Sequence, residues 1–84
     1  MEQVVKVSIS NVAFTLEQDA HQRLEAYLLS LNSHYSGSSN SQEIVFAIEE
    51  RISEILIEKG YKEAVIPIVV IEEIIAQLGS ADQI

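Results

Sequence analysis

The stretch from Asn40 to Lys59 is the sequence feature that most limits what this chain can fold into. At 100° per residue, its apolar residues occupy two sides of a helix. One side holds Ile44, Val45, Ile48, Ile52, Ile55 and Leu56, and the opposite side holds Phe46 and Ile57. Asn40 suits the capping position, Glu43 stands where a capping-box side chain reaches back, and Gly60 supplies a stop. We therefore expect a helix over 41–59, and apolar residues on two sides are typical of a central helix.

Two short runs of alternating residues precede this helix. Residues 4–9 and 12–16 place large apolar side chains at every second position, which is typical of half-buried strands. Between them, Asn11 tolerates the positive φ of a tight turn. We predict an antiparallel hairpin over about 4–16. Because two strands alone are only marginally stable in water, the apolar face of the hairpin must pack on helices.

Helical spacing predicts two further helices. One covers 17–35, with an apolar stripe made by Ala20, Leu24, Tyr27, Leu28, Leu31 and Tyr35. The serine-rich segment 36–40 predicts a loop between antiparallel helices. Pro67 can open a helix but disrupts a helix interior, so we predict the last helix over 68–78, with Gly79 as its αL stop. An alternative makes 64–70 a third strand beside the hairpin, because the run is β-branched and proline is allowed at sheet edges.

These elements predict a single α+β domain over 1–84, with an N-terminal hairpin followed by three helices packed around the central helix. A chain of 84 residues buries only about 60–65% of the surface that its unfolded form exposes, so the core is small. Hydrophobic residues make up 48% of the chain, against 3 Gly and 1 Pro, which favours a folded domain over a disordered acidic tail. The positive mean hydropathy of +0.18 suggests apolar surface left for a partner or a second copy.

Charge and composition exclude several classes of function. Thirteen acidic and five basic residues give a net charge of −8, which repels phosphate backbones, so we expect no nucleic-acid binding. The absence of cysteine excludes disulfides and thiolate metal sites. The apolar run 64–71 is far shorter than the roughly 20 residues of a spanning helix. We expect membrane attachment only through a segment absent from this chain.

No residue pattern indicates catalysis. His21 and His34 lie thirteen residues apart in a predicted helix, too far to chelate one ion. The glutamate pairs at 49–50 and 72–73 point about 100° apart on their helices, so neither pair converges on one atom. No GxSxG motif surrounds the serines of 36–41. We therefore expect no catalytic residue, no metal and no cofactor.

Four residues of the central helix are candidates for binding a partner: Phe46, Arg51, Glu54 and Ile57. Phe46 and Ile57 are eleven residues apart, which places them three turns apart along one line. Either the hairpin or the last helix covers them, or they form an exposed apolar stripe with a binding role. Arg51 and Glu54 share a helix flank. An exposed pair of this kind contributes about 0.3–0.5 kcal/mol, whereas arginine at a partner contact is a common hot spot.

The order of several short motifs resembles one bacterial domain family. The first helix matches its entry and its Tyr-Leu step through Asp19, Ala20, Tyr27 and Leu28. The central helix matches the pattern I-E-x-R-I-x-E through Ile48, Glu49, Arg51, Ile52 and Glu54. The end matches E-E-x-I-x-x-x-G through Glu72, Glu73, Ile75 and Gly79, with Asp82 near a further acidic position. With these motifs the chain is similar to the N-terminal cytoplasmic domain of PspC-type (phage shock protein C-like) proteins of the Bacteroidetes. The tail 78–84 is also similar to the ending of HAAS-type signalling domains.

The chain departs from the PspC-type pattern at a few positions. Phe46 and Ala47 stand at positions that are commonly polar, and Asn11 stands where glycine is common. Pro67 and the three residues after it replace a Thr-Leu-Glu-Asp type of helix entry.

The resemblance implies a regulatory or adaptor role in envelope-stress signalling. It implies a cytoplasmic location at the inner face of the bacterial inner membrane in the full-length protein, and no enzymatic activity. The favoured function is a non-enzymatic interaction domain that binds a protein partner or itself. The alternative is an antitoxin-like or transcription-related acidic adaptor for a basic protein, and a small hydrolase is a distant third.

Overall fold

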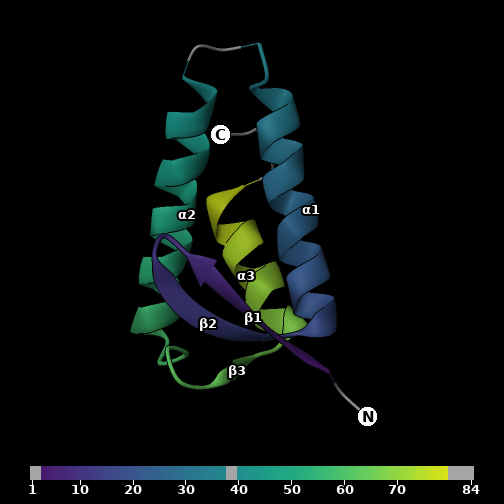
Figure 1. Ribbon diagram of the computed structural model, residues 1–84, viewed down its shortest axis with the longest axis vertical. Helices are drawn as coiled ribbons and strands as arrows, with labels where there is room; N and C mark the ends of the chain where they lie inside the picture. Colours follow the sequence, from purple (N-terminus) through teal and green to yellow (C-terminus); the bar gives the residue numbers. More distant parts are fainter. Residues whose placement is uncertain (1–2, 38–39, 80–84) are drawn as a thin grey trace.

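The computed structural model describes residues 3–37 and 40–79 (Figure 1). Its elements follow in the order β1 (Val4–Ile9), β2 (Val12–Glu17), α1 (Gln18–His34), α2 (Ser41–Glu58), β3 (Val65–Ile66) and α3 (Ile68–Leu78). The predicted α+β class, with a hairpin followed by three helices, is confirmed. The observed bounds of the hairpin and of each helix lie within one residue of those predicted.

A two-residue turn closes the hairpin. Ile9 pairs with Val12, and Ser10 and Asn11 between them have φ values of 53° and 67°. Two successive residues with positive φ make a type I′ turn, whose twist matches that of the flanking strands. Burial alternates along β1 as predicted, with Val5, Val7 and Ile9 turned toward the helices and Val4, Lys6 and Ser8 toward solvent.

The two ends of α2 lie next to the residues that the sequence predicts, Asn40 and Gly60. Asn40 holds the N-cap position as predicted, although its side chain makes no capping hydrogen bond. At the other end Gly60 has a φ of 84°, which glycine adopts without steric cost. The N–H of Gly60 donates to the carbonyl of Ile57 at 3.0 Å, and the N–H of Tyr61 donates to that of Leu56 at 2.9 Å. This pair of bonds is the Schellman motif that the glycine stop predicts.

The segment before α3 combines the two predicted readings. Val65 and Ile66 form β3, which pairs in parallel with Thr15 and Leu16 of β2. Pro67 then provides an extended N-cap, with φ −81° and ψ 163°, and α3 begins at Ile68 as predicted. The third strand therefore exists but covers only two residues. The prediction of an αL stop at Gly79 is wrong in detail, because its φ of 93° and ψ of 162° lie in an extended region open to glycine.

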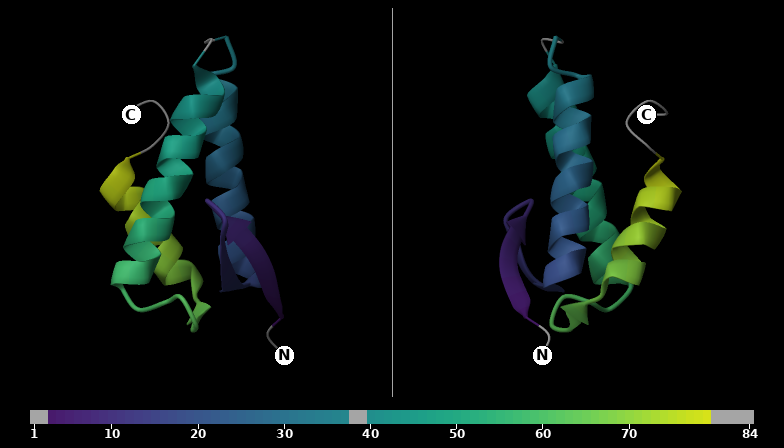
Figure 2. Two further views of the ribbon diagram at one scale, coloured as in Figure 1. Left: turned by 60° about the vertical axis from the view of Figure 1, so that its left-hand side comes forward. Right: turned by 90° about the vertical axis from the view of Figure 1, so that its right-hand side faces the viewer.

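The elements form three layers. Figure 2 shows the hairpin on one side, the antiparallel pair of α1 and α2 in the middle, and α3 on the other side. α1 packs against α3, α2 and both strands of the hairpin, whereas α2 packs mainly against α1 and β1. The buried core comprises Ile9, Phe14, Leu16, Ala20, Leu24, Tyr27, Leu31, Ile48, Ile52, Ile55, Leu56, Ile66, Val70, Ile71, Ile74 and Ile75.

Polar contacts join α3 and the residue that follows it to α1. Arg23 of α1 donates from Nε to a carboxylate oxygen of Glu72 at 2.7 Å. The hydroxyl of Tyr27, which is buried, donates to the carbonyl of Gly79 at 2.7 Å. Burial raises the pKa of the Tyr27 hydroxyl, while Arg23 lowers it and Tyr35 raises it further. The hydrogen bond therefore satisfies a carbonyl at the end of α3 with a donor from the core.

Replacing Ile52 by alanine should be among the most damaging changes to stability. Its side chain is fully buried, so truncation should lower the free energy of unfolding by about 2–5 kcal/mol. We expect a loss in the same range for Ile48→Ala, because Ile48 is also buried. Chemical denaturation measures both effects. The control Ile57→Ala removes an exposed side chain from the same helix and should cost less than about 1 kcal/mol. Equal losses for Ile52→Ala and the control would contradict this account of the core.

Replacing Tyr27 by phenylalanine should change how stability depends on pH. At pH 7 the free energy of unfolding of the variant should be lower by about 0.5–1.5 kcal/mol, because the hydrogen bond to Gly79 is lost. Above pH 10 the unfolded wild type loses the tyrosine proton first, because the pKa is higher in the folded state. The stability of the wild type should therefore fall as pH rises through the folded pKa, and the difference from Tyr27→Phe should shrink. Urea titrations between pH 7 and 11 measure the free energy of unfolding of both proteins. A constant difference between the wild type and Tyr27→Phe over this pH range would refute the prediction.

Candidate protein interface on α2

The solvent-facing side of α2 carries all four residues that the sequence suggested for partner binding. We call this surface the outer face of α2, and it consists of the exposed residues Glu43, Phe46, Glu50, Arg51, Glu54, Ile57 and Glu58. On an α-helix these positions span an arc of about 140°. The residues that α2 buries lie outside this arc, so the helix is buried on one side. The expectation of a helix covered on two sides is wrong.

The line of α2 that joins Phe46 to Ile57 is covered only in its middle. Phe46 is 53% exposed and Ile57 is 43% exposed, whereas Ser53 between them is only 4% exposed. β1 packs against α2, and the turn end of the hairpin lies against the middle of this helix (Figure 1). Phe46 and Ile57 are therefore exposed, and the predicted alternative in which the hairpin or the last helix covers them is wrong. The hairpin covers the centre of the line, and two separate apolar side chains remain exposed, about 16 Å apart along the helix.

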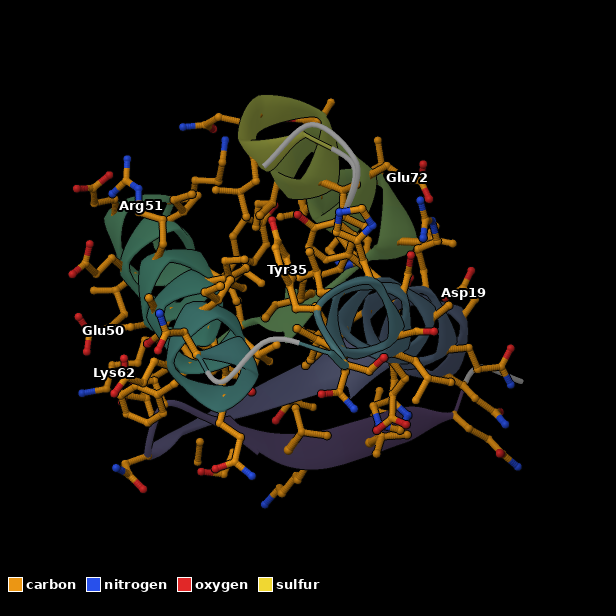
Figure 3. The ribbon with its side chains drawn as sticks, turned by 90° about the horizontal axis from the view of Figure 1, so that it is seen from above. Asp19, Tyr35, Glu50, Arg51, Lys62 and Glu72 are labelled. Carbon is orange, nitrogen blue, oxygen red and sulfur yellow. The ribbon has the colours of Figure 1, made fainter. Side chains whose placement is uncertain are left out.

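Arg51 and Glu54 pair on the outer face. The guanidinium Nη1 of Arg51 donates to a carboxylate oxygen of Glu54 at 3.3 Å, and both side chains are about half exposed. Figure 3 shows Arg51 and Glu50 directed away from the other helices. Such an exposed pair contributes only about 0.3–0.5 kcal/mol. A partner that offers better hydrogen-bond geometry could therefore replace either member at little cost.

Negative charge dominates the outer face. Four carboxylates, Glu43, Glu50, Glu54 and Glu58, share this face with the single guanidinium of Arg51. Of these carboxylates, the sequence predicts a partner-binding role for Glu54 alone, although helical spacing already places Glu58 on the flank of Arg51 and Glu50 beside the apolar stripe. The same period also brings Glu43 to this face, because positions 43, 50, 54 and 58 recur at spacings of seven and four residues. The outer face thus combines two exposed apolar side chains with several carboxylates. This combination suits a partner surface that is both apolar and basic.

Several polar residues outside the outer face of α2 make contacts within the domain. Glu72 and Glu73 bind different partners, Arg23 and Lys59, so these neighbouring carboxylates do not converge. His21 pairs with Glu25 four residues on, at 3.1 Å. Among residues 3–37 and 40–79, no group of three or more histidine, aspartate or glutamate side chains is placed to hold a metal ion.

Exposed apolar side chains outside α2 are spread over several elements. Leu29 lies on α1, Val4 on β1, Val65 on β3 and Val69 on α3. Of the helices in the described part of the chain, none combines the length and the apolar character needed to cross a bilayer.

Comparison of this chain with protein-family models, with curated proteins and with solved structures found no match. The resemblance to PspC-type domains therefore stays a prediction from the motifs quoted above.

The double substitution Phe46→Ser and Ile57→Ser should leave the domain folded. Both side chains are about half exposed, so their removal should cost less than about 2 kcal/mol in total, compared with about 2–5 kcal/mol for one buried isoleucine. Circular dichroism and urea titration measure this. A loss above about 4 kcal/mol would show that the two side chains serve the core.

Proposed function

We propose that this chain is a non-enzymatic protein-interaction domain that binds its partner through the outer face of α2. One observation carries the proposal: Phe46 and Ile57 stay exposed on a helix whose other large apolar side chains are buried or half-buried. Exposed apolar anchors with charged surroundings are a common form of helix-mediated recognition. Their removal should cost little stability, so a binding role explains them better than a packing role.

We further propose that the domain serves the kind of envelope-stress regulation implied by its resemblance to PspC-type proteins. Such a domain would lie on the cytoplasmic side of the bacterial inner membrane. The net charge of −8 is compatible with that position, because an anionic leaflet repels the domain and leaves its surface free for proteins. Fractionation of cells that express the full-length gene product tests this. Recovery in the inner-membrane fraction supports the proposal, and recovery in the cytosol alone contradicts it.

An acidic adaptor for a basic protein is the second candidate. The four carboxylates of the outer face favour it, because they would attract lysine and arginine residues of a partner. The substitutions Glu50→Lys and Glu54→Lys should then slow association, and the effect should weaken as salt is added. A membrane-anchored regulator and a cytosolic basic protein are different preys, so affinity capture followed by mass spectrometry separates the two candidates.

The interface itself is tested by a matched pair of double variants. Phe46→Ser with Ile57→Ser removes the two anchors of the outer face, and Leu29→Ser with Val69→Ser removes two exposed apolar side chains elsewhere. We expect both variants to stay folded. The partner captured by the wild type, or the dimer seen by sedimentation, should be lost only in the first variant.

Equal partner capture and equal oligomeric state in the two double variants would refute a role for the outer face of α2. Loss in the second variant alone would place the interface on another surface.

A further inference from the structure

β1 is an edge strand whose outer side carries unpaired backbone groups. In the sheet order β1-β2-β3, β2 occupies only one side of β1. Antiparallel partners alternate between pairs that exchange both backbone hydrogen bonds and pairs that exchange none. The N–H of Gln18 donates to the carbonyl of Gln3 at 2.9 Å, so the bonded pairs contain the odd-numbered residues of this strand. The N–H and C=O groups of Val4, Lys6 and Ser8 therefore point away from β2.

Nothing in residues 3–37 and 40–79 takes up these groups. The backbone hydrogen bonds outside the helices and strands do not involve Val4, Lys6 or Ser8, and all three residues are exposed. A row of free donors and acceptors on a valine-rich strand is a template for another strand. The charge of Lys6 disfavours pairing of this edge with unrelated strands.

The hairpin covers only part of the helix pair. Figure 1 shows the hairpin over the lower part of α1 and α2, with β3 at the bottom. β1 crosses in front of β2 in this view, so its end at the turn lies above β2 and its start lies below the end of β2. Val5 and Val7, on the inner face of β1, are only half-buried. An added strand would place apolar side chains beside these two valines on the same face of the sheet.

We propose that the outer edge of β1 binds an extended strand of a partner protein, antiparallel to β1, with apolar side chains toward the helices and a carboxylate opposite Lys6. The inference is separate from the role of the outer face of α2, because backbone groups of β1 carry it. A second copy of this chain fits poorly. Symmetric antiparallel pairing along the whole edge would place Lys6 opposite Lys6 of the copy, and like charges directly opposite are destabilising.

A carboxylate opposite Lys6 is compatible with the acidic character of the chain. At an ionic strength of about 0.15 M the Debye length is about 8 Å, so the more distant carboxylates are largely screened. A direct cross-strand neighbour lies about 5 Å away and is screened much less. The charge of Lys6 therefore favours a carboxylate on the partner residue directly opposite it.

The test titrates the peptide acetyl-Val-Thr-Val-Glu-Val-Thr-Val-amide into the ¹⁵N-labelled domain and follows its amides by NMR. We expect the amide protons of Val4, Lys6 and Ser8 to move downfield and to exchange more slowly with solvent. The amides of Val5 and Val7 already bond to β2 and should change little. No change at the first three amides, at a peptide concentration of about 2 mM, would overturn the proposal.

Two control peptides separate strand pairing from unspecific contact. N-methylation of the glutamate and threonine amides removes the donors that face β1 and should abolish binding, whereas N-methylation of the two valine amides that flank the glutamate should be tolerated. Replacing the glutamate by lysine should weaken binding about threefold or more. Equal binding of all these peptides would refute the proposed edge pairing.

Two variants of the domain complete the test. Lys6→Pro removes the N–H at the centre of the edge without touching a bond to β2 and should abolish binding, whereas Lys6→Thr keeps the N–H and should retain it. Unchanged binding to Lys6→Pro would contradict the proposal. A wild-type chain that sediments as a dimer with protected amides at Val4, Lys6 and Ser8 would also overturn it, because a second copy would then occupy the edge.

Discussion

Burial of the apolar stripe along α1 is the constraint on which the rest of this domain depends. Ala20, Leu24, Tyr27 and Leu31 of this stripe are all buried, and α1 packs against α3, α2 and both strands of the hairpin. A chain of this length has one small core and no cysteine to strengthen it. Losing contact with α1 would therefore expose the apolar faces of α3 and of the hairpin together. Arg23 and Tyr27 add directional bonds that hold α3 in register on this stripe.

The arrangement around α1 leaves α2 with one open side. The hairpin packs against α2 through β1, Ser53 of α2 is buried, and α3 packs chiefly on α1. Phe46 and Ile57 therefore remain in solvent at either side of the hairpin contact. Exposing two large apolar side chains forgoes part of the hydrophobic stabilisation that a small domain needs. That loss is the physical argument for a binding role on the outer face of α2.

The two proposed binding surfaces use different physics. The outer face of α2 offers side-chain anchors and negative charge, so recognition there would depend on partner sequence and on salt. The edge of β1 offers backbone donors and acceptors, so affinity there would come from strand geometry and selectivity from the side chain opposite Lys6. The separate tests distinguish the two surfaces, because one test changes side chains of α2 and the other follows backbone amides of β1.

The sequence by itself determined the features that rest on local chemistry. Neighbouring residues are enough to predict the helices from their spacing. They also predict the turn at Ser10 and Asn11, the stop at Gly60 and the start of α3 after Pro67. The candidate residues of α2 also follow from the helical period, since it places them on one face.

Only the tertiary structure decided which of two apolar sides α2 would bury and which residues of 64–66 would join the sheet. The pairing of Leu16 with Ile66 and the bond from Tyr27 to Gly79 join segments far apart in the chain. Likewise, the partial cover over the line from Phe46 to Ile57 depends on how far the hairpin reaches across α2. Local preferences cannot specify such contacts, because they form only where distant segments bury apolar surface together.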